Sequence, residues 1–291
     1  MASVVPDSHG DVQSPVGAPA LGDGDFRRVA AIMQSDARIH LTEVKKTLVH
    51  SRLSRRLRIN GLDSFKAYLD MVESDAEERR QMVTALTTNH THFFREDHHF
   101  DHLREELLPR LKSDPNRSPV RIWSSACSSG EEVYTTAMCL LGTDRSHAQW
   151  MRGRDVRLLA TDLSEPVVQA TREAFYSENT VEPVPHAYRD LWMVREGNGY
   201  RMADAARALV TARVLNLFHP WPMRQRYDAI FCRNVMIYFD DTAKEELEAR
   251  LVDMLKPGGF LYIGHSERLI GPAAEKMKPC GNTIYCLEDT N

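Results

Sequence analysis

The spacing of apolar residues divides this chain into two regions. Between residues 25 and 88 the apolar positions recur every three or four residues, a period typical of amphipathic helices. From Val120 onward, short apolar runs alternate with helical patterns, and this alternation predicts parallel strands connected by helices. We therefore expect an N-terminal helical domain over 25–88 and an α/β domain over 120–291.

The second region resolves into individual elements. We expect strands at 120–123, 156–162, 212–217, 227–239 and 283–288, a strand and its loop within 260–267, and helices beginning at 131, 164 and 241. The sequence KPGG at 256–259 predicts a turn. The less regular stretch 176–212, which includes the hairpin-like sequence GNGYRM, predicts an insertion between core elements.

Two segments lie outside these domains. Residues 1–24 mix Gly, Pro, Ala, Ser and Asp with few residues that could pack, so we expect a disordered tail. The linker 89–119 begins with NHTHFFREDHHF, whose histidines lack a third ligand at the usual spacing, so we expect no metal site. Arg95, set between aromatic residues, is instead a candidate for holding a carboxylate.

Composition restricts the cellular location and the classes of ligand that we expect. Among 291 residues, 42% are hydrophobic and 27% charged, which is ordinary for a soluble globular protein. The net charge of −4 gives no general attraction to nucleic acid or to an anionic membrane. No apolar stretch has the length of a membrane span, and the N-terminus lacks the features of a secretion signal. The five cysteines form no CxxC pair, so we expect a reduced, cytoplasmic protein.

The stretch VRIWSSACSSGEEVY, residues 120–134, carries the main chemical signal. A strand, a small-residue loop and a helix N-terminus form the nucleotide-binding corner of doubly wound α/β folds. Glu131 and Glu132 would repel a phosphate but suit a positively charged nucleoside, such as the sulfonium of S-adenosylmethionine (SAM). Asp162 ends the next predicted strand, where an acid that binds ribose is expected.

These residues leave other ligands open. A nicotinamide dehydrogenase would share the fold and the ribose acid, although a single glycine and an acidic helix start count against it. A nucleic-acid methyltransferase is a further alternative, and the net charge of −4 counts against it. Amino-group methyltransferases commonly carry Asn/Asp-Pro-Pro-Tyr where this chain has CRNV, so an oxygen acceptor is favoured.

Taken in order, six motifs carry a resemblance to a known family. They are HLTEVKKTLVHSRLSRRLR, ALTTNHTHFFRE, WSSACSSGEEVY, ATDLSEPVV, YDAIFCRNVMIYF and LKPGGFLYIGHSE. Over residues 26–288 the chain resembles the CheR-type chemotaxis receptor protein-glutamate O-methyltransferases. The resemblance implies a helical domain and a class I, Rossmann-like methyltransferase domain with a mainly parallel sheet. It also implies a small antiparallel β-subdomain, which we map to 176–212.

The same resemblance implies the reaction and its residues. SAM would methylate glutamate carboxylates of chemoreceptors, leaving methyl esters and S-adenosylhomocysteine. The implied cofactor contacts are Asn89, Thr91, Arg95, Glu132, Asp162, Asn216, Leu217, Arg233 and Asn234. Arg95 and Tyr238 would lie beside the transferred methyl group. Val133 departs from the family, which usually has proline there.

The sequence also predicts contacts with partner proteins. Lys45, Arg52 and Arg56 share one face of a predicted helix, and this basic stripe is a candidate for binding the glutamate-rich methylation helices of receptors. Some family members dock a C-terminal receptor peptide on the β-subdomain, and this ability stays open here. We expect a monomer that does not insert into membranes or bind nucleic acid. A non-catalytic relative that binds SAM or S-adenosylhomocysteine as a regulator is the alternative.

Overall fold

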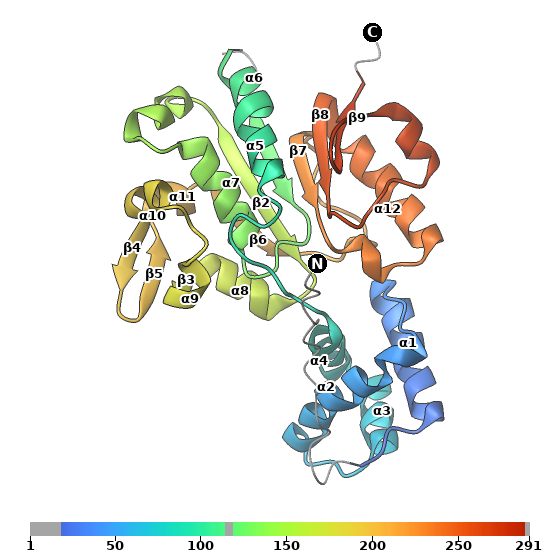
Figure 1. The fold of residues 1–291 in the computed structure, drawn as a ribbon. Helices are drawn as coiled ribbons and strands as arrows, with labels where there is room; N and C mark the ends of the chain where they lie inside the picture. The colour runs from blue at the N-terminus through green and yellow to red at the C-terminus, as the bar shows by residue number, and fades with distance from the viewer. Residues whose placement is uncertain (1–18, 114–118, 289–291) are drawn as a thin grey trace, which may run out of the picture. The chain divides into compact units, whose positions relative to one another are not determined.

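A computed structural model describes residues 19–113 and 119–288 of the chain (Figure 1). The chain divides into two compact units, one ending at Thr87 and the other beginning at Thr88. Most of the predicted tail, residues 1–18, lies outside the described residues. In the described part of the chain, no helix is long and apolar enough to cross a membrane.

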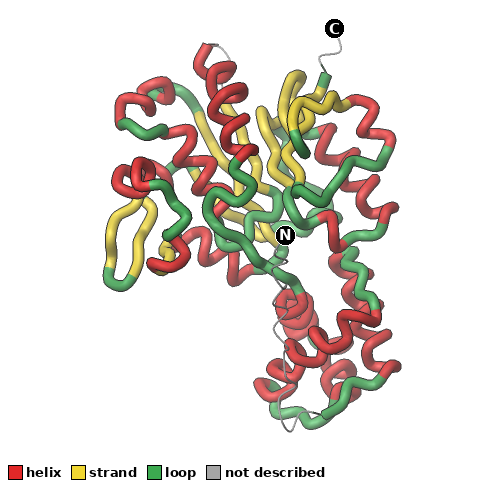
Figure 2. The backbone as a smooth tube through the Cα atoms, viewed as in Figure 1, coloured by secondary structure: helices red, strands yellow, loops and turns green. Residues whose placement is uncertain are grey.

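The first unit is built from amphipathic helices joined by loops (Figure 2). They are α1 (Asp23–Ala37), the 3-10 helix η1 (Glu43–Lys45), α2 (Lys46–Ile59), α3 (Phe65–Ser74) and α4 (Ala76–Leu86). Each helix of α1–α4 buries one apolar face, with Val29, Leu53, Leu69 and Met82 fully covered. The side chains of Ser64 and Asp75 cap α3 and α4 by accepting backbone N–H groups. The expected helical domain is therefore present, and its first helix begins at Asp23.

The second unit contains a seven-stranded sheet in the order β6-β2-β1-β7-β8-β10-β9 (Figure 1). Its strands are β1 (Val120–Ser124), β2 (Val156–Asp162), β6 (Val210–Val214), β7 (Tyr227–Cys232), β8 (Leu255–Ile263), β9 (Met277–Gly281) and β10 (Ile284–Leu287). The strands from β6 to β8 are parallel, whereas β10 is antiparallel to both of its neighbours. The prediction of a mainly parallel sheet is confirmed.

Helices and short turns complete this unit. They are α5 (His98–His102), the π-helical turn η2 (Leu103–Leu107), α6 (Leu108–Ser113), α7 (Glu131–Leu141), η3 (Arg145–Met151), α8 (Glu165–Glu173), η4 (Met236–Tyr238), α12 (Asp241–Asp253) and η5 (Pro272–Lys276). Helices α5 to α7 share a core with the sheet face that bears Ile122 and Phe231. Burying this face fixes the strand ends, which carry the polar residues described below.

A small second sheet lies between α8 and β6 in the sequence (Figure 1). Its antiparallel strands are β3 (Phe175–Ser177), β4 (Met193–Glu196) and β5 (Gly199–Met202), in the order β3-β5-β4, accompanied by the short helices α9 (Glu178–Val181), α10 (His186–Trp192) and α11 (Asp204–Arg207). At Gly199 a Cβ atom would lie 2.3 Å from the carbonyl oxygen of Tyr176, so the β3–β5 pairing requires glycine there. The expected antiparallel insertion is confirmed.

Some element boundaries differ from the sequence expectation. The apolar run 227–239 is a strand only as far as Cys232, because Asn234 has a left-handed backbone with φ 57° and the chain turns away from the sheet. The KPGG turn lies within β8, where Gly258 has φ 69° and the pairing with β7 is irregular. The strand expected at 212–217 is β6, which begins and ends earlier, and β9 was not expected.

Candidate active site

Asp162, at the end of β2, is hydrogen bonded to the loop that follows β1. Its Oδ2 accepts the backbone N–H of Ser128 at 2.9 Å, and its Oδ1 accepts that of Ser164 at 3.0 Å. The Ser128 hydroxyl in turn donates to the carbonyl of Asn89 at 2.9 Å. Burial raises the pKa of Asp162, while these backbone hydrogen bonds act in the opposite direction. Two expected cofactor residues, Asn89 and Asp162, thus contact the same loop residue, Ser128.

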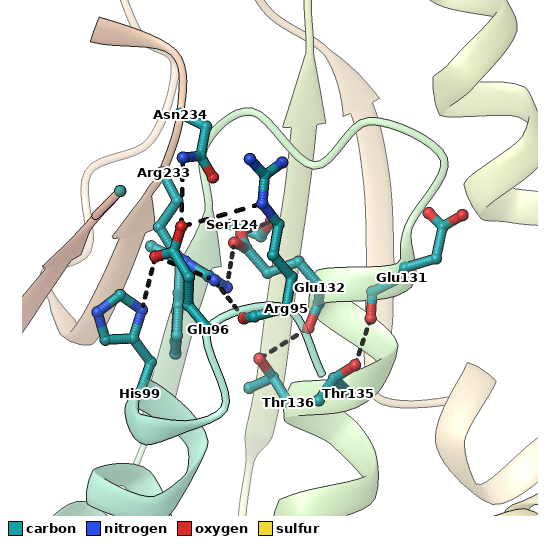
Figure 3. A network of polar contacts seen from close by, with 12 residues as sticks. Arg95, Glu96, His99, Ser124, Glu131, Glu132, Thr135, Thr136, Arg233 and Asn234 are labelled. Atoms are coloured by element: carbon teal, nitrogen blue, oxygen red, sulfur yellow. Dashed lines mark hydrogen bonds and ion pairs between the residues drawn. The ribbon is translucent and has the colours of Figure 1, made fainter. Parts of the chain in front are cut away.

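The two acids at the start of α7 have different surroundings. Glu132 Oε1 accepts a hydrogen bond from Ser124 Oγ at 2.6 Å, and its Oε2 pairs with Arg233 Nη1 at 3.1 Å. The Glu131 carboxylate instead accepts from Ser129 Oγ at 2.8 Å and lies on the other side of the helix (Figure 3). The site residue Glu132 therefore belongs to the polar network, and Glu131 does not. Burial raises the pKa of Glu132, and Arg233 opposes the shift.

Arg233 follows β7 and its side chain is only 2% exposed. Besides Glu132, it donates through Nη2 to the carbonyl of Arg95 and lies 3.4 Å from Glu96 Oε2. The guanidinium also lies over the ring of Phe100, 5.6 Å from its centroid. The expected cofactor residues Arg233, Glu132 and Arg95 are thus joined in one network (Figure 3).

Arg95 lies in a tight turn at the start of the second unit. Its Nη1 donates to the carbonyl of His90 at 2.9 Å, and its Nε lies 3.9 Å from Glu96 Oε1. The neighbouring residues Phe94 and Glu96 both have φ 56°. Because His90 follows Asn89, which contacts the Ser128–Asp162 pair, the linker runs from the Asp162 end of the site to Arg95.

Three of the remaining expected residues follow the carboxyl ends of β6 and β7, which lie on either side of the β2–β1 pair. Asn216 and Leu217 come after β6, and the N–H of the preceding Leu215 is bonded to the Asp162 carbonyl at 2.9 Å. Tyr238 is half-buried in η4, after β7. Carboxyl ends of parallel strands share one edge of a sheet, which is where ligands bind in open α/β folds. No contact of Thr91 joins it to the network in the described structure.

Two acids of the site had no role assigned from the sequence. Glu96 contacts residues on three segments, and Glu267 accepts the N–H groups of Gly264 at 2.6 Å, Asn234 at 3.0 Å and Ile237 at 3.3 Å. Glu267 thereby holds the chain between β7 and η4 against the loop after β8. Both acids lie inside motifs quoted above, FFRE and GHSE, but their partners are set by the fold.

The basic stripe lies in the helical unit and has partners of its own. Arg52 Nη1 donates to the carbonyls of Leu86 at 2.9 Å and Thr87 at 2.8 Å. Arg56 pairs with Glu78, which also accepts from the Tyr68 hydroxyl. Lys45 is exposed. Arg52 and Arg56 thus contribute to the helical unit itself, and receptor binding by the stripe stays a prediction.

The residues of this edge fit SAM. Arg233 Nε is buried without a hydrogen-bond partner among the described residues, so it can donate to a ligand. Asp162 can accept ribose hydroxyls in addition to its backbone donors, because each carboxylate oxygen has a second lone pair. The paired guanidinium and carboxylate groups suit the charged amino-acid end of the cofactor.

Fold and site together define a class I SAM-dependent methyltransferase, and comparison with known proteins identifies its family. The SAM-binding domain of CheR methyltransferases matches residues 89–286, and the all-alpha domain of CheR methyltransferases matches residues 24–87. The chain belongs to the CheR methyltransferase family.

Curated relatives support this assignment over nearly the full chain. A "Probable chemotaxis protein methyltransferase" of Rhizobium etli is 40% identical, over 87% of this chain and 96% of the relative. Chemotaxis protein methyltransferase 2 of Pseudomonas aeruginosa is 38% identical, over 90% and 92%. The chemotaxis protein methyltransferase of Escherichia coli is 35% identical, over 92% of each chain. The resemblance stated from the motifs is confirmed.

Proposed function

We propose that this protein transfers the methyl group of SAM to glutamate side chains of chemoreceptors, forming glutamate methyl esters and S-adenosylhomocysteine. The observation that carries the proposal is the arrangement of Asp162 and the Glu132–Arg233 pair at neighbouring strand ends. This arrangement offers a carboxylate for ribose and a charged pair for the amino-acid end. The acidic helix start at α7 favours a cationic nucleoside over a dinucleotide.

Methyl transfer to a carboxylate does not require general acid–base catalysis. A glutamate side chain has an ordinary pKa of about 4.3 and is already a carboxylate at neutral pH, so no general base is needed. When bound, SAM supplies a methyl group activated by a sulfonium. The protein must align the acceptor oxygen with that methyl group and exclude water, so positioning supplies most of the acceleration.

Separate residues bind the cofactor and orient the acceptor. Asp162 accepts the ribose hydroxyls, and Glu132 with Arg233 binds the amino-acid end. The Arg95 guanidinium orients one oxygen of the acceptor carboxylate, and the Tyr238 hydroxyl donates to the acceptor or lines its path. Thr91, Asn216, Leu217, Asn89 and Asn234 complete the cofactor contacts.

We further propose which residues bind the receptor. The exposed Lys45, with the helix face that carries Arg52 and Arg56, attracts the glutamate-rich methylation helices. The enzyme works as a monomer in the cytoplasm, a setting compatible with its five free cysteines. Docking of a receptor C-terminal peptide on the β3-β5-β4 sheet is a second contact to be tested.

The test is transfer of a labelled methyl group from SAM to receptor-containing membranes. We expect label in the receptor that is released as methanol by mild base, because methyl esters hydrolyse there and N-methyl groups do not. Receptors whose acceptor glutamates are replaced by alanine should take up no label. Binding of SAM without any transfer would instead support the alternative, a non-catalytic regulator.

A further inference from the structure

We propose that Glu96 is a positioning residue for methyl transfer, which acts by holding Arg95 in the orientation that meets the acceptor carboxylate. The inference rests on the proposed function. It concerns a residue that contacts neither a proposed ribose site nor the Glu132 carboxylate directly, but that lies next to Arg95 in the chain and in space (Figure 3).

The Glu96 carboxylate joins three segments of the second unit. Its Oε1 accepts from Asn234 Nδ2 at 3.3 Å and lies 3.1 Å from His265 Nδ1. Its Oε2 lies 3.4 Å from Arg233 Nη2 and 3.7 Å from His99 Nδ1. The turn at Arg95, the segment after β7 and the loop after β8 are therefore all tied to one side chain that is 11% exposed.

The backbone around Arg95 needs such support. Phe94 and Glu96, on either side of Arg95, have φ 56°, and Asn234 has φ 57°. Left-handed backbone is unfavourable for a residue other than glycine, and it persists only where surrounding contacts hold it. Two of these three left-handed residues, Glu96 and Asn234, are held by the contacts of the Glu96 carboxylate. The contacts of Glu96 thus fix the turn on the C-terminal side of Arg95, and on the other side the Thr135 hydroxyl accepts the N–H of Phe94 at 3.2 Å.

Glu96 is also negatively charged at neutral pH, as this positioning role requires. Burial alone would raise the pKa of Glu96, but Arg233 and the hydrogen bonds from His265 and Asn234 lower it to about 2. Burial, together with the Arg233 charge, lowers the pKa of the adjacent His99 to about 3. At neutral pH a carboxylate and a neutral imidazole therefore face the guanidinium groups. Glu96 Oε1 lies 3.9 Å from Arg95 Nε, so this negative charge faces the guanidinium that it positions.

A double-mutant cycle on kcat tests this role. We expect Glu96→Gln to lower kcat by about 10- to 100-fold in the wild-type background, the range of one to two charged hydrogen bonds. In an Arg95→Lys background the same change should lower kcat by less than about threefold, because the group through which Glu96 acts is already altered. Asp97→Asn, an exposed change in the same turn, is the matched control and should leave kcat unchanged.

Two further measurements separate positioning from a general structural role. The Kd for S-adenosylhomocysteine should change by less than about threefold in Glu96→Gln. A crystal structure of Glu96→Gln should show the Arg95 guanidinium displaced from the His90 carbonyl, and this readout does not depend on activity. Equal losses of kcat in both backgrounds, a parallel loss of cofactor affinity, or an unmoved Arg95 would each overturn the inference. Absence of methyl transfer by the wild-type protein would instead refute the proposed function.

Discussion

Arg233 Nη1 lies 3.1 Å from Oε2 of Glu132, and this buried ion pair joins the end of β7 to the start of α7. The side chains are 2% and 11% exposed, so neither charge is well solvated. Breaking a buried pair by removing one partner leaves the other charge uncompensated. Removing either partner should therefore destabilise the fold, and this can be measured.

Glu132→Gln should lower the free energy of unfolding by about 2–4 kcal/mol, because Arg233 loses a charged partner. The neighbouring change Glu131→Gln is the matched control. In the described structure the Glu131 carboxylate accepts side-chain hydrogen bonds only from the Ser129 hydroxyl, which a glutamine can also accept, so its loss should cost less than about 1 kcal/mol. Urea unfolding of both variants compares them, and equal destabilisation would contradict the assigned difference.

Asp162→Asn should weaken S-adenosylhomocysteine binding by about 10- to 100-fold. The amide loses the charge that strengthens contacts to ribose hydroxyls, and its NH₂ must face one of the backbone donors of Ser128 or Ser164. Isothermal titration calorimetry measures the change. Asp253→Asn, at the exposed end of α12, should bind like the wild type. Unchanged binding by Asp162→Asn would remove Asp162 from the cofactor site.

Tyr238→Phe keeps the ring and removes the hydroxyl. If the hydroxyl donates to the acceptor carboxylate, kcat should fall by about tenfold, the value of one hydrogen bond, with the cofactor Kd unchanged. Single-turnover methyl transfer measures this step directly. A variant with wild-type kcat would show that Tyr238 only lines the path.

Acid should remove the stabilising effect of Glu96. Its folded-state pKa of about 2 lies below the ordinary value of 4.5, so its contribution is fully present above about pH 4.5 and is lost as the pH falls toward 2. The shift corresponds to roughly 3 kcal/mol at neutral pH. We expect Glu96→Gln to be less stable than the wild type at pH 7, and the difference to shrink at pH 3. Urea midpoints that differ equally at both pH values would contradict this.

Receptor recruitment by the basic stripe is best tested at Lys45. Lys45→Glu should raise KM for the receptor several-fold while leaving the cofactor Kd unchanged, and the effect should decline with added salt. Lys112→Glu, an equal charge change at an exposed residue of α6, is the control. Reversal of Arg56 would instead destabilise the helical unit, because Arg56 pairs with the buried Glu78. Equal KM values for the two lysine variants would exclude Lys45 from recruitment.

Sequence patterns located the residues whose place follows from local structure. Asp162 could be predicted because it ends an apolar strand, and Glu132 because it opens a helix after a small-residue loop. Glu96 and Glu267 could not be given roles, since Glu96 meets Asn234 across 138 positions and Glu267 reaches Asn234 across 33. The apolar run beyond Cys232 was mistaken for strand because hydrophobic spacing does not distinguish a buried turn from a strand. The partners of Arg52 and Arg56 could not be predicted either, because helical periodicity does not show which residues of another helix they meet.

The most direct test of the account is a crystal structure of the protein with S-adenosylhomocysteine. We predict the ribose hydroxyls within hydrogen-bond distance of Asp162, the amino-acid end at the Glu132–Arg233 pair, and the sulfur facing Arg95 and Tyr238. A nucleoside bound away from Asp162, or a sulfur that faces away from Arg95, would contradict it.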